Sequence, residues 1–170
     1  MMGLPERDSR TKIVEVEDAD FAWMIRGQPL VRNGFSLPAT EVEPPEILEY
    51  LRALVRRLHA AGSRSAWMVI ADATVVGLCS YKGVPDAAGV VEIGYGLNAE
   101  HRRRGHAASA IGLLILAAYD DPTVRVLTAE IATANIASHR VVEANGFVRT
   151  GSRIDDDDGE LVIWQRSVQT

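Results

Sequence analysis

Short stretches of alternating apolar and polar residues dominate the first half of the chain, together with two segments of helical spacing. Alternation is typical of half-buried strands, whereas apolar residues three and four apart indicate an amphipathic helix. Proline and glycine mark a loop between the two helices, and Asp72 and Ala73 mark a hairpin turn. The predicted elements are a strand at 12–16, a helix capped by Asp18 that reaches Arg26, a helix from Pro44 to about Ala61, and strands at 65–71, 74–81 and 89–97.

In the second half, strands and helices alternate. Apolar residues surround most of the helix that begins at Gly105, which predicts that this helix is mostly buried. The predicted elements are a helix at 105–120, a strand at 124–131, a helix at 136–144, and strands at 147–151 and 161–167. Strand, helix, strand in this order implies parallel pairing between 89–97 and 124–131. The predicted fold class is mixed α/β, in a single domain spanning residues 1–170.

Composition narrows the function classes. The chain has 170 residues, of which 47% are hydrophobic, and it contains no apolar run long enough for a membrane span. Residues 1–12 are polar and lack the apolar core of a signal peptide, and Cys79 is the only cysteine. We therefore expect a cytoplasmic protein without membrane attachment. A net charge of −5 argues against nucleic-acid binding.

The segment 90–107 is the strongest chemical signal, because a strand runs into an arginine-rich turn that opens a helix. Arg102, Arg103 and Arg104 carry three positive charges with no acid between them, and Gly105 follows. Backbone N–H groups at a helix N-terminus favour anions, so this turn is suited to a phosphate or pyrophosphate. The competing interpretation is a solvated arginine cluster before an ordinary helix.

The strand before this turn places Glu92, Gly94 and Gly96 on one face and apolar residues on the other. Two glycines beside a carboxylate leave bare backbone. A partly desolvated glutamate can take the proton of an incoming ammonium, although a surface or salt-bridged carboxylate explains Glu92 equally well. Residues 94–99 also satisfy a dinucleotide-binding fingerprint, but its glycines alternate within a strand, which is the wrong context.

Together these motifs resemble the GNAT N-acetyltransferases, and most of all the branch of ribosomal-protein N-terminal acetyltransferases. The resemblance covers nearly the whole domain, and its motifs are RRRGHA at 102–107, NIAS at 135–138 and GF at 146–147. It implies acetyl-CoA as the acetyl donor, no metal, and a mostly antiparallel sheet that splays between its fourth and fifth strands (89–97 and 124–131) and is flanked by about four helices.

The resemblance also assigns roles to residues. It implies Glu92 as base and Ser138 as the acid that protonates the sulfur, with solvent as an alternative, because Val142 stands where many relatives carry a tyrosine. Asn135 is also a good N-cap for the following helix. The implied cofactor-binding residues are Tyr95, Gly96, Leu97, Arg102, Arg103, Arg104, Gly105, His106, Ala107, Asn135, Ser138 and Arg140.

These observations predict an acetyl-CoA-dependent N-acetyltransferase that acts on a primary amine, either a protein N-terminus or a small amine. We expect the acceptor pocket at the 28–43 loop, the helix that carries Trp23, and the acidic run 155–158, which also fits a solvated hairpin turn. Two alternatives remain: a non-catalytic acyl-CoA-binding or sensor protein of the same fold, and an interaction domain whose arginines bind a protein or nucleic acid. The sequence is compatible with a monomer or a homodimer.

Overall fold

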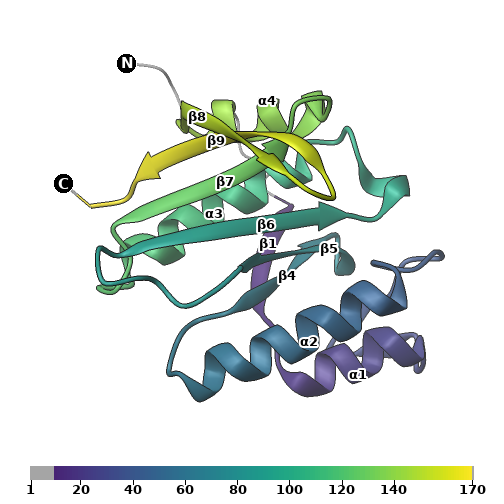
Figure 1. Cartoon of the computed structure of the whole chain (residues 1–170). Helices are drawn as coiled ribbons and strands as arrows, with labels where there is room; N and C mark the ends of the chain where they lie inside the picture. Colours follow the sequence, from purple (N-terminus) through teal and green to yellow (C-terminus); the bar gives the residue numbers. More distant parts are fainter. Residues whose placement is uncertain (1–9, 170) are drawn as a thin grey trace.

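The computed structural model describes residues 10–169, arranged as one mixed sheet with helices on both faces (Figure 1). The expectation that the chain has no signal peptide concerns residues 1–12, most of which lie outside the described residues. The strands are β1 Thr11–Glu15, β2 Val31–Arg32, β3 Phe35–Ser36, β4 Ala66–Ala71, β5 Thr74–Tyr81, β6 Val90–Leu97, β7 Val126–Ala132, β8 Val148–Asp155 and β9 Gly159–Ser167. The helices are α1 Asp18–Arg26, α2 Pro45–Ala60, α3 His106–Tyr119 and α4 Ile136–Ala144, with a short 3-10 helix η1 at Ala99–His101. None of the described helices could cross a bilayer.

The strand order along the sheet is β1-β4-β5-β6-β7-β9-β8, with β2 and β3 attached beside β5. All neighbours on this path pair antiparallel except β6 and β7, which pair parallel as predicted. The mixed α/β fold class is thus confirmed. The predicted loop after α1 contains the short strands β2 and β3, and β8 continues to Asp155, beyond the predicted end at residue 151.

The start of α1 corrects one prediction. The N-cap residue is Glu17 and not Asp18, and the Glu17 backbone N–H donates to Oδ2 of Asp20 at 2.8 Å. Asp18 instead forms ion pairs with Arg52 and Arg56 of α2, each at 2.7 Å. These two guanidinium groups hold the pKa of the Asp18 carboxyl far below its usual value. Asp18 therefore joins α1 to α2.

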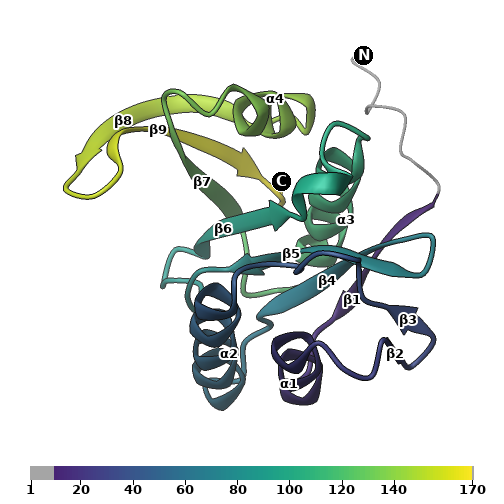
Figure 2. The same ribbon diagram turned by 90° about the vertical axis from the view of Figure 1, so that its right-hand side faces the viewer.

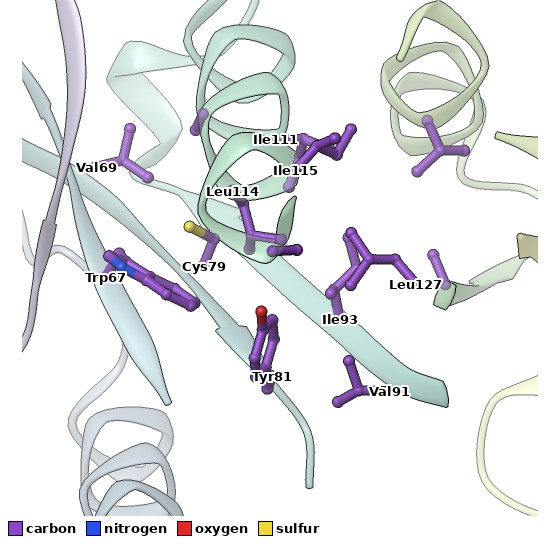
Figure 3. Packing of buried hydrophobic residues seen from close by; sticks show 14 of the residues in the cluster. Trp67, Val69, Cys79, Tyr81, Val91, Ile93, Ile111, Leu114, Ile115 and Leu127 are labelled. Carbon is purple, nitrogen blue, oxygen red and sulfur yellow. The ribbon is translucent and has the colours of Figure 1, made fainter. Parts of the chain in front are cut away.

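Two hydrophobic layers cover the central strands, with α1 and α2 on one face of the sheet and α3 and α4 on the other (Figure 2). Alternate residues of β4 belong to opposite layers: Trp67 and Val69 pack in the α3 cluster, whereas Met68 and Ile70 pack in the α1 and α2 cluster. The α3 cluster contains Leu114 among strand residues (Figure 3). Burial on both faces explains why β4 reads as a continuous apolar run.

The parallel pair β6–β7 is short. Only Val90, Val91 and Glu92 pair with β7, at Val126, Leu127 and Thr128. Residues 93–97 stay paired with β5, while β7 continues in register with β9. The sheet therefore splays between β6 and β7, as the resemblance implied, and the β7-facing edge of residues 93–97 has no strand partner among the described residues.

We predict that Leu114→Ala lowers the free energy of unfolding by about 2–5 kcal/mol, because it leaves a cavity between α3 and the sheet. Leu116→Ala on the same helix is the matched control. Leu114 is fully buried, whereas Leu116 is 44% exposed, so the control should cost about 0.5 kcal/mol or less. Urea denaturation measures both values, and equal losses would contradict the observed orientation of α3.

Candidate active site

Asn98 fixes the end of β6 and is buried. Its backbone N–H donates to the carbonyl of Val76 on β5 at 2.8 Å. Its side-chain amide donates to Oγ1 of Thr40 at 2.6 Å and to the carbonyl of Glu41 at 2.7 Å. Its Oδ1 accepts from the backbone N–H of Glu100 at 3.0 Å, which caps η1. One side chain thus joins β6, the loop before α2 and the turn before α3.

The arginine-rich turn opens α3 with left-handed backbone at Arg103 (φ 63°) and Gly105 (φ 82°). Gly105 is the N-cap residue, so no cap side chain occupies the first-turn N–H groups of α3. Arg102, Arg103 and Arg104 are exposed, and Nε of Arg102 donates to the carbonyl of Leu97 at 3.2 Å. A Cβ added at Gly105 would meet nothing within 4 Å, so the space before the helix is open. This combination is suited to a phosphate group.

His106 and Ala107 form the first positions of α3. The imidazole of His106 is buried, and its Nδ1 lies 2.9 Å from Oγ1 of Thr11, so it joins α3 to β1. The part of His106 in cofactor binding stays a prediction. Ala107 is half-buried and keeps the first turn of the helix narrow.

The two faces of β6 differ as predicted. Val91 and Ile93 are buried in the α3 cluster, whereas Glu92, Gly94 and Gly96 face the opposite side. Oε1 of Glu92 forms an ion pair with Nζ of Lys82 at 2.8 Å. The stem of Lys82 also lies over Gly94, where a Cβ would come within 3.0 Å of Cε of the lysine. In this structure Glu92 is thus a salt-bridged carboxylate.

A second carboxylate, which the sequence analysis did not single out, lies further along the same face. A Cβ on Gly96 would collide with Oε1 of Glu43, so this carboxylate lies directly against the backbone of β6. Glu43 is half-buried and precedes α2. Burial raises the pKa of the Glu43 carboxyl above its usual value, nearby Arg102 opposes this shift, and Glu41 adds to it.

The N-terminus of α4 faces β6 across the splay. Oδ1 of Asn135 accepts from the backbone N–H of Ser138 at 3.2 Å, so its predicted N-cap role is confirmed. The hydroxyl of Tyr95 donates to the carbonyl of Ser138 at 3.0 Å, and burial raises the pKa of this phenol. Arg140 is exposed, whereas Val142 is fully buried in the core. Ser138 and Tyr95 therefore meet at the first turn of α4.

His139 is not a free surface residue, because both of its ring nitrogens are hydrogen-bonded. The indole N–H of Trp164 donates to its Nδ1 at 3.1 Å, so its protonated Nε2 donates to the carbonyl of Ala132 at 3.0 Å. These bonds join the start of α4 to β7 and β9. They hold the segment that carries Asn135 and Ser138 in place.

Several other candidates have structural roles. Cys79 is buried, and burial raises the pKa of its thiol to about 12, so it acts as a small hydrophobe. The glycines of the dinucleotide fingerprint lie inside β6 and not in the turn after a strand, which excludes that interpretation. Oδ1 of Asp155 accepts from the backbone N–H groups of Asp157 and Asp158, as in a hairpin turn. Within residues 10–169 no group of acidic, histidine or cysteine side chains could hold a metal.

A pocket of about 270 Å³ lies between α1 and residues 37–43. Its lining includes Met24, Leu37 and Glu43. The 28–43 loop and the helix that carries Trp23, where the acceptor pocket is expected, therefore both contribute to it. Trp23 is buried and its indole N–H donates to the carbonyl of Pro29, so it supports the loop rather than lining the pocket. The acidic hairpin does not contribute to this lining either.

Comparison with known proteins agrees with this geometry. YjdG, an uncharacterized N-acetyltransferase of Bacillus subtilis (strain 168), is 30% identical over 105 residues, which cover 61% of this chain and 62% of YjdG. The aligned segment is therefore less than two thirds of that relative's length. The structure of RimL, a ribosomal L7/L12 alpha-N-protein acetyltransferase in complex with coenzyme A, superposes with a TM-score of 0.72 at 14% identity, covering 96% of this chain and 97% of RimL.

The aminoglycoside acetyltransferase AAC(6')-Ib, also in complex with coenzyme A, has a TM-score of 0.66 at 17% identity, with 92% of this chain and 94% of that protein covered. At these identities the two structures show a shared fold. Residues 10–148 match the family model for the acetyltransferase (GNAT) domain, which is most of the chain. The chain therefore belongs to the GNAT acetyltransferase family.

Proposed function

We propose that this protein is an acetyl-CoA-dependent N-acetyltransferase that moves the acetyl group directly to a primary amine. The splay of β6 from β7 carries the proposal. It leaves the β7-facing edge of residues 93–97 without a strand partner among the described residues, between an uncapped helix N-terminus and the first turn of α4. The two relatives of this fold described above were both determined in complex with coenzyme A.

The proposed cofactor site is formed by the start of α3, the free edge of β6 and the start of α4. The first turn of α3 and the Arg102, Arg103 and Arg104 side chains bind the pyrophosphate, because they offer N–H donors and positive charge. The free edge at Tyr95, Gly96 and Leu97 hydrogen-bonds the pantetheine amides as an added strand would. Asn135, Ser138 and Arg140 form the opposite wall. The bound cofactor supplies an activated acetyl thioester.

The proposed reaction requires two proton transfers. The acceptor amine must lose one proton before it attacks, and the departing sulfur must gain one. Backbone N–H groups near Tyr95 and Leu97 polarise the carbonyl. The hydroxyl of Ser138 or a water molecule protonates the sulfur, and the Tyr95 hydroxyl lies at the same helical turn. Val142 takes no part because it is buried in the core.

The base that the sequence predicts, Glu92, stays a prediction. It lies on the glycine face, four residues before Gly96, which is about 13 Å along an extended strand. Its carboxylate is also paired with Lys82. As base it would therefore act through intervening water and in competition with that ammonium group.

For the acceptor we propose a protein N-terminus or a small amine, bound at the pocket between α1 and residues 37–43. Named relatives of this fold include both a ribosomal-protein and an aminoglycoside acetyltransferase. We further propose that the protein works in the cytoplasm, since its one cysteine permits no internal disulfide, which fits a reducing compartment. Both a monomer and a homodimer are compatible with the site, which one chain contains.

We predict that Gly105→Asn weakens coenzyme A binding at least about tenfold, which corresponds to about 1.4 kcal/mol. Asparagine tolerates the left-handed backbone, so the fold should survive, but its side chain occupies the open space before α3 where the phosphate approaches. Gly62→Asn is the matched control, because Gly62 has φ 73° and open space at the end of α2. Isothermal titration calorimetry with coenzyme A measures both. Equal affinities for the two variants would overturn the pyrophosphate assignment.

A transfer assay separates the enzyme from a sensor protein, an alternative favoured by the buried Val142. We expect acetyl-CoA to be consumed in the presence of at least one amine from a panel of alanine-initiated peptides, polyamines and aminoglycosides, with one acetylated product per thiol released. Mass spectrometry and thiol detection measure the two. Tight acetyl-CoA binding without transfer to any panel member would instead support the sensor.

A further inference from the structure

We propose that Glu43 receives the ammonium group of the acceptor beside Gly96 and takes its proton. The inference rests on the proposed acetyl transfer and adds to it a base contributed by the loop before α2. It differs from the assignment that the sequence suggests, in which a glutamate on β6 itself performs this step. Three observations carry it: the position of Glu43, the absence of a hydrogen bond or ion pair to it within residues 10–169, and the way its loop is held.

Position distinguishes the two carboxylates on this face of β6. Oε1 of Glu43 lies against the Cα of Gly96, within the stretch whose backbone is proposed to polarise the thioester carbonyl. Glu92 lies about 13 Å further back along the strand. Because a base must come within about 3 Å of the nitrogen whose proton it removes, or reach it through one water, Glu43 is better placed.

Availability points the same way. Within residues 10–169, Glu43 has neither a hydrogen bond nor an ion pair, whereas Glu92 is held by Lys82 at 2.8 Å. A half-buried carboxylate without a hydrogen bond or ion pair costs free energy, and an incoming ammonium group would pair with it. The free carboxylate is thus suited to binding a cation.

The loop that carries Glu43 is fixed to the strand it serves. The amide of Asn98, which follows β6 directly, donates to Thr40 and to the carbonyl of Glu41. Glu43 also lines the pocket between α1 and residues 37–43, so one side chain borders both the strand and the proposed acceptor pocket. Asn98 therefore holds the loop that carries Glu43 at the end of β6.

The surrounding charges define the pH dependence. Burial raises the pKa of Glu43, Arg102 from the turn opposes the shift, and Glu41 from its own loop adds to it. On the strand side, the Glu92 and Lys82 charges are paired with each other. A base works only when deprotonated, so kcat/KM should rise with pH through a pKa above that of an ordinary glutamate, about 4.3.

The step balances as follows. The ammonium gives one proton to Glu43, and the resulting amine forms a C–N bond with the acetyl carbon while the C–S bond breaks. The sulfur gains the second nitrogen-bound proton through Ser138 or water, and Glu43 releases its proton to solvent. The products are the N-acetyl amine, the free thiol of coenzyme A and one proton.

The test compares Glu43→Gln, Glu92→Gln and, as a matched control, Glu46→Gln, an exposed glutamate of the first turn of α2. The probes are acetyl-CoA with an alanine-initiated peptide and with kanamycin. We expect Glu43→Gln to lower kcat/KM about 100-fold or more and to abolish its rise at acidic pH, while acetyl-CoA affinity by calorimetry stays unchanged. Glu92→Gln should keep that rise, and Glu46→Gln should behave as the unchanged protein.

If the rise of kcat/KM at acidic pH is lost in Glu92→Gln but not in Glu43→Gln, the inference is overturned in favour of Glu92. Loss of acetyl-CoA binding in Glu43→Gln would overturn it as well, because Glu43 would then support the cofactor site. Glu43→Asp keeps the charge but shortens the side chain, so it should retain the rise of kcat/KM at acidic pH while kcat falls. This result would show that the loss in Glu43→Gln is not caused by misfolding. If the unchanged protein acetylates neither probe nor any other panel amine, the proposed function fails, and not this assignment alone.

Discussion

The divergence of β6 from β7 after Glu92 is the constraint on which the site depends. Beyond this point β6 stays paired with β5 and β7 stays paired with β9. The backbone groups of β6 and β7 that face the gap therefore do not hydrogen-bond each other. Backbone N–H and C=O groups left without partners cost free energy when they are shielded from water. The gap therefore favours an extended ligand with amide groups of its own. The turn before α3 and the cap of α4 lie at this gap, which allows one ligand to contact all three.

Charged side chains of both signs lie around the same strand. Arg102, Arg103 and Arg104 follow it and are exposed, whereas Glu43 and Glu92 lie along the face away from α3. An anionic donor and a cationic acceptor would thus be attracted to different regions around one strand. Since the chain as a whole carries a charge of −5, the arginine-rich turn is a local reversal of sign. This arrangement suits direct transfer, in which both substrates must be bound together.

The sequence predicted those features whose causes are local. The alternation along β6, the cap at Asn135 and the parallel crossover through α3 all follow from residue order and are confirmed. The partners of Glu92 and His139 and the position of Glu43 were not predicted, because each contact is made between elements far apart in the chain. Sheet pairing brings Lys82 opposite Glu92, and Asn98 brings the loop of Glu43 to β6. Asn98 itself had a detectable signal, since a small polar amide directly after a strand is typical of a cap or turn.

Two glycines of the site are glycines for different reasons. Gly105 has a left-handed backbone that L-residues adopt at a cost, although the space around it is open. Gly96 has no such backbone requirement, but a Cβ there would displace the Glu43 carboxylate from the strand. The first glycine is explained by the turn alone, whereas the second is explained only by a side chain more than fifty residues earlier in the sequence. Gly96 thus makes room, on the strand proposed to hold the donor, for the carboxylate that we propose faces the acceptor.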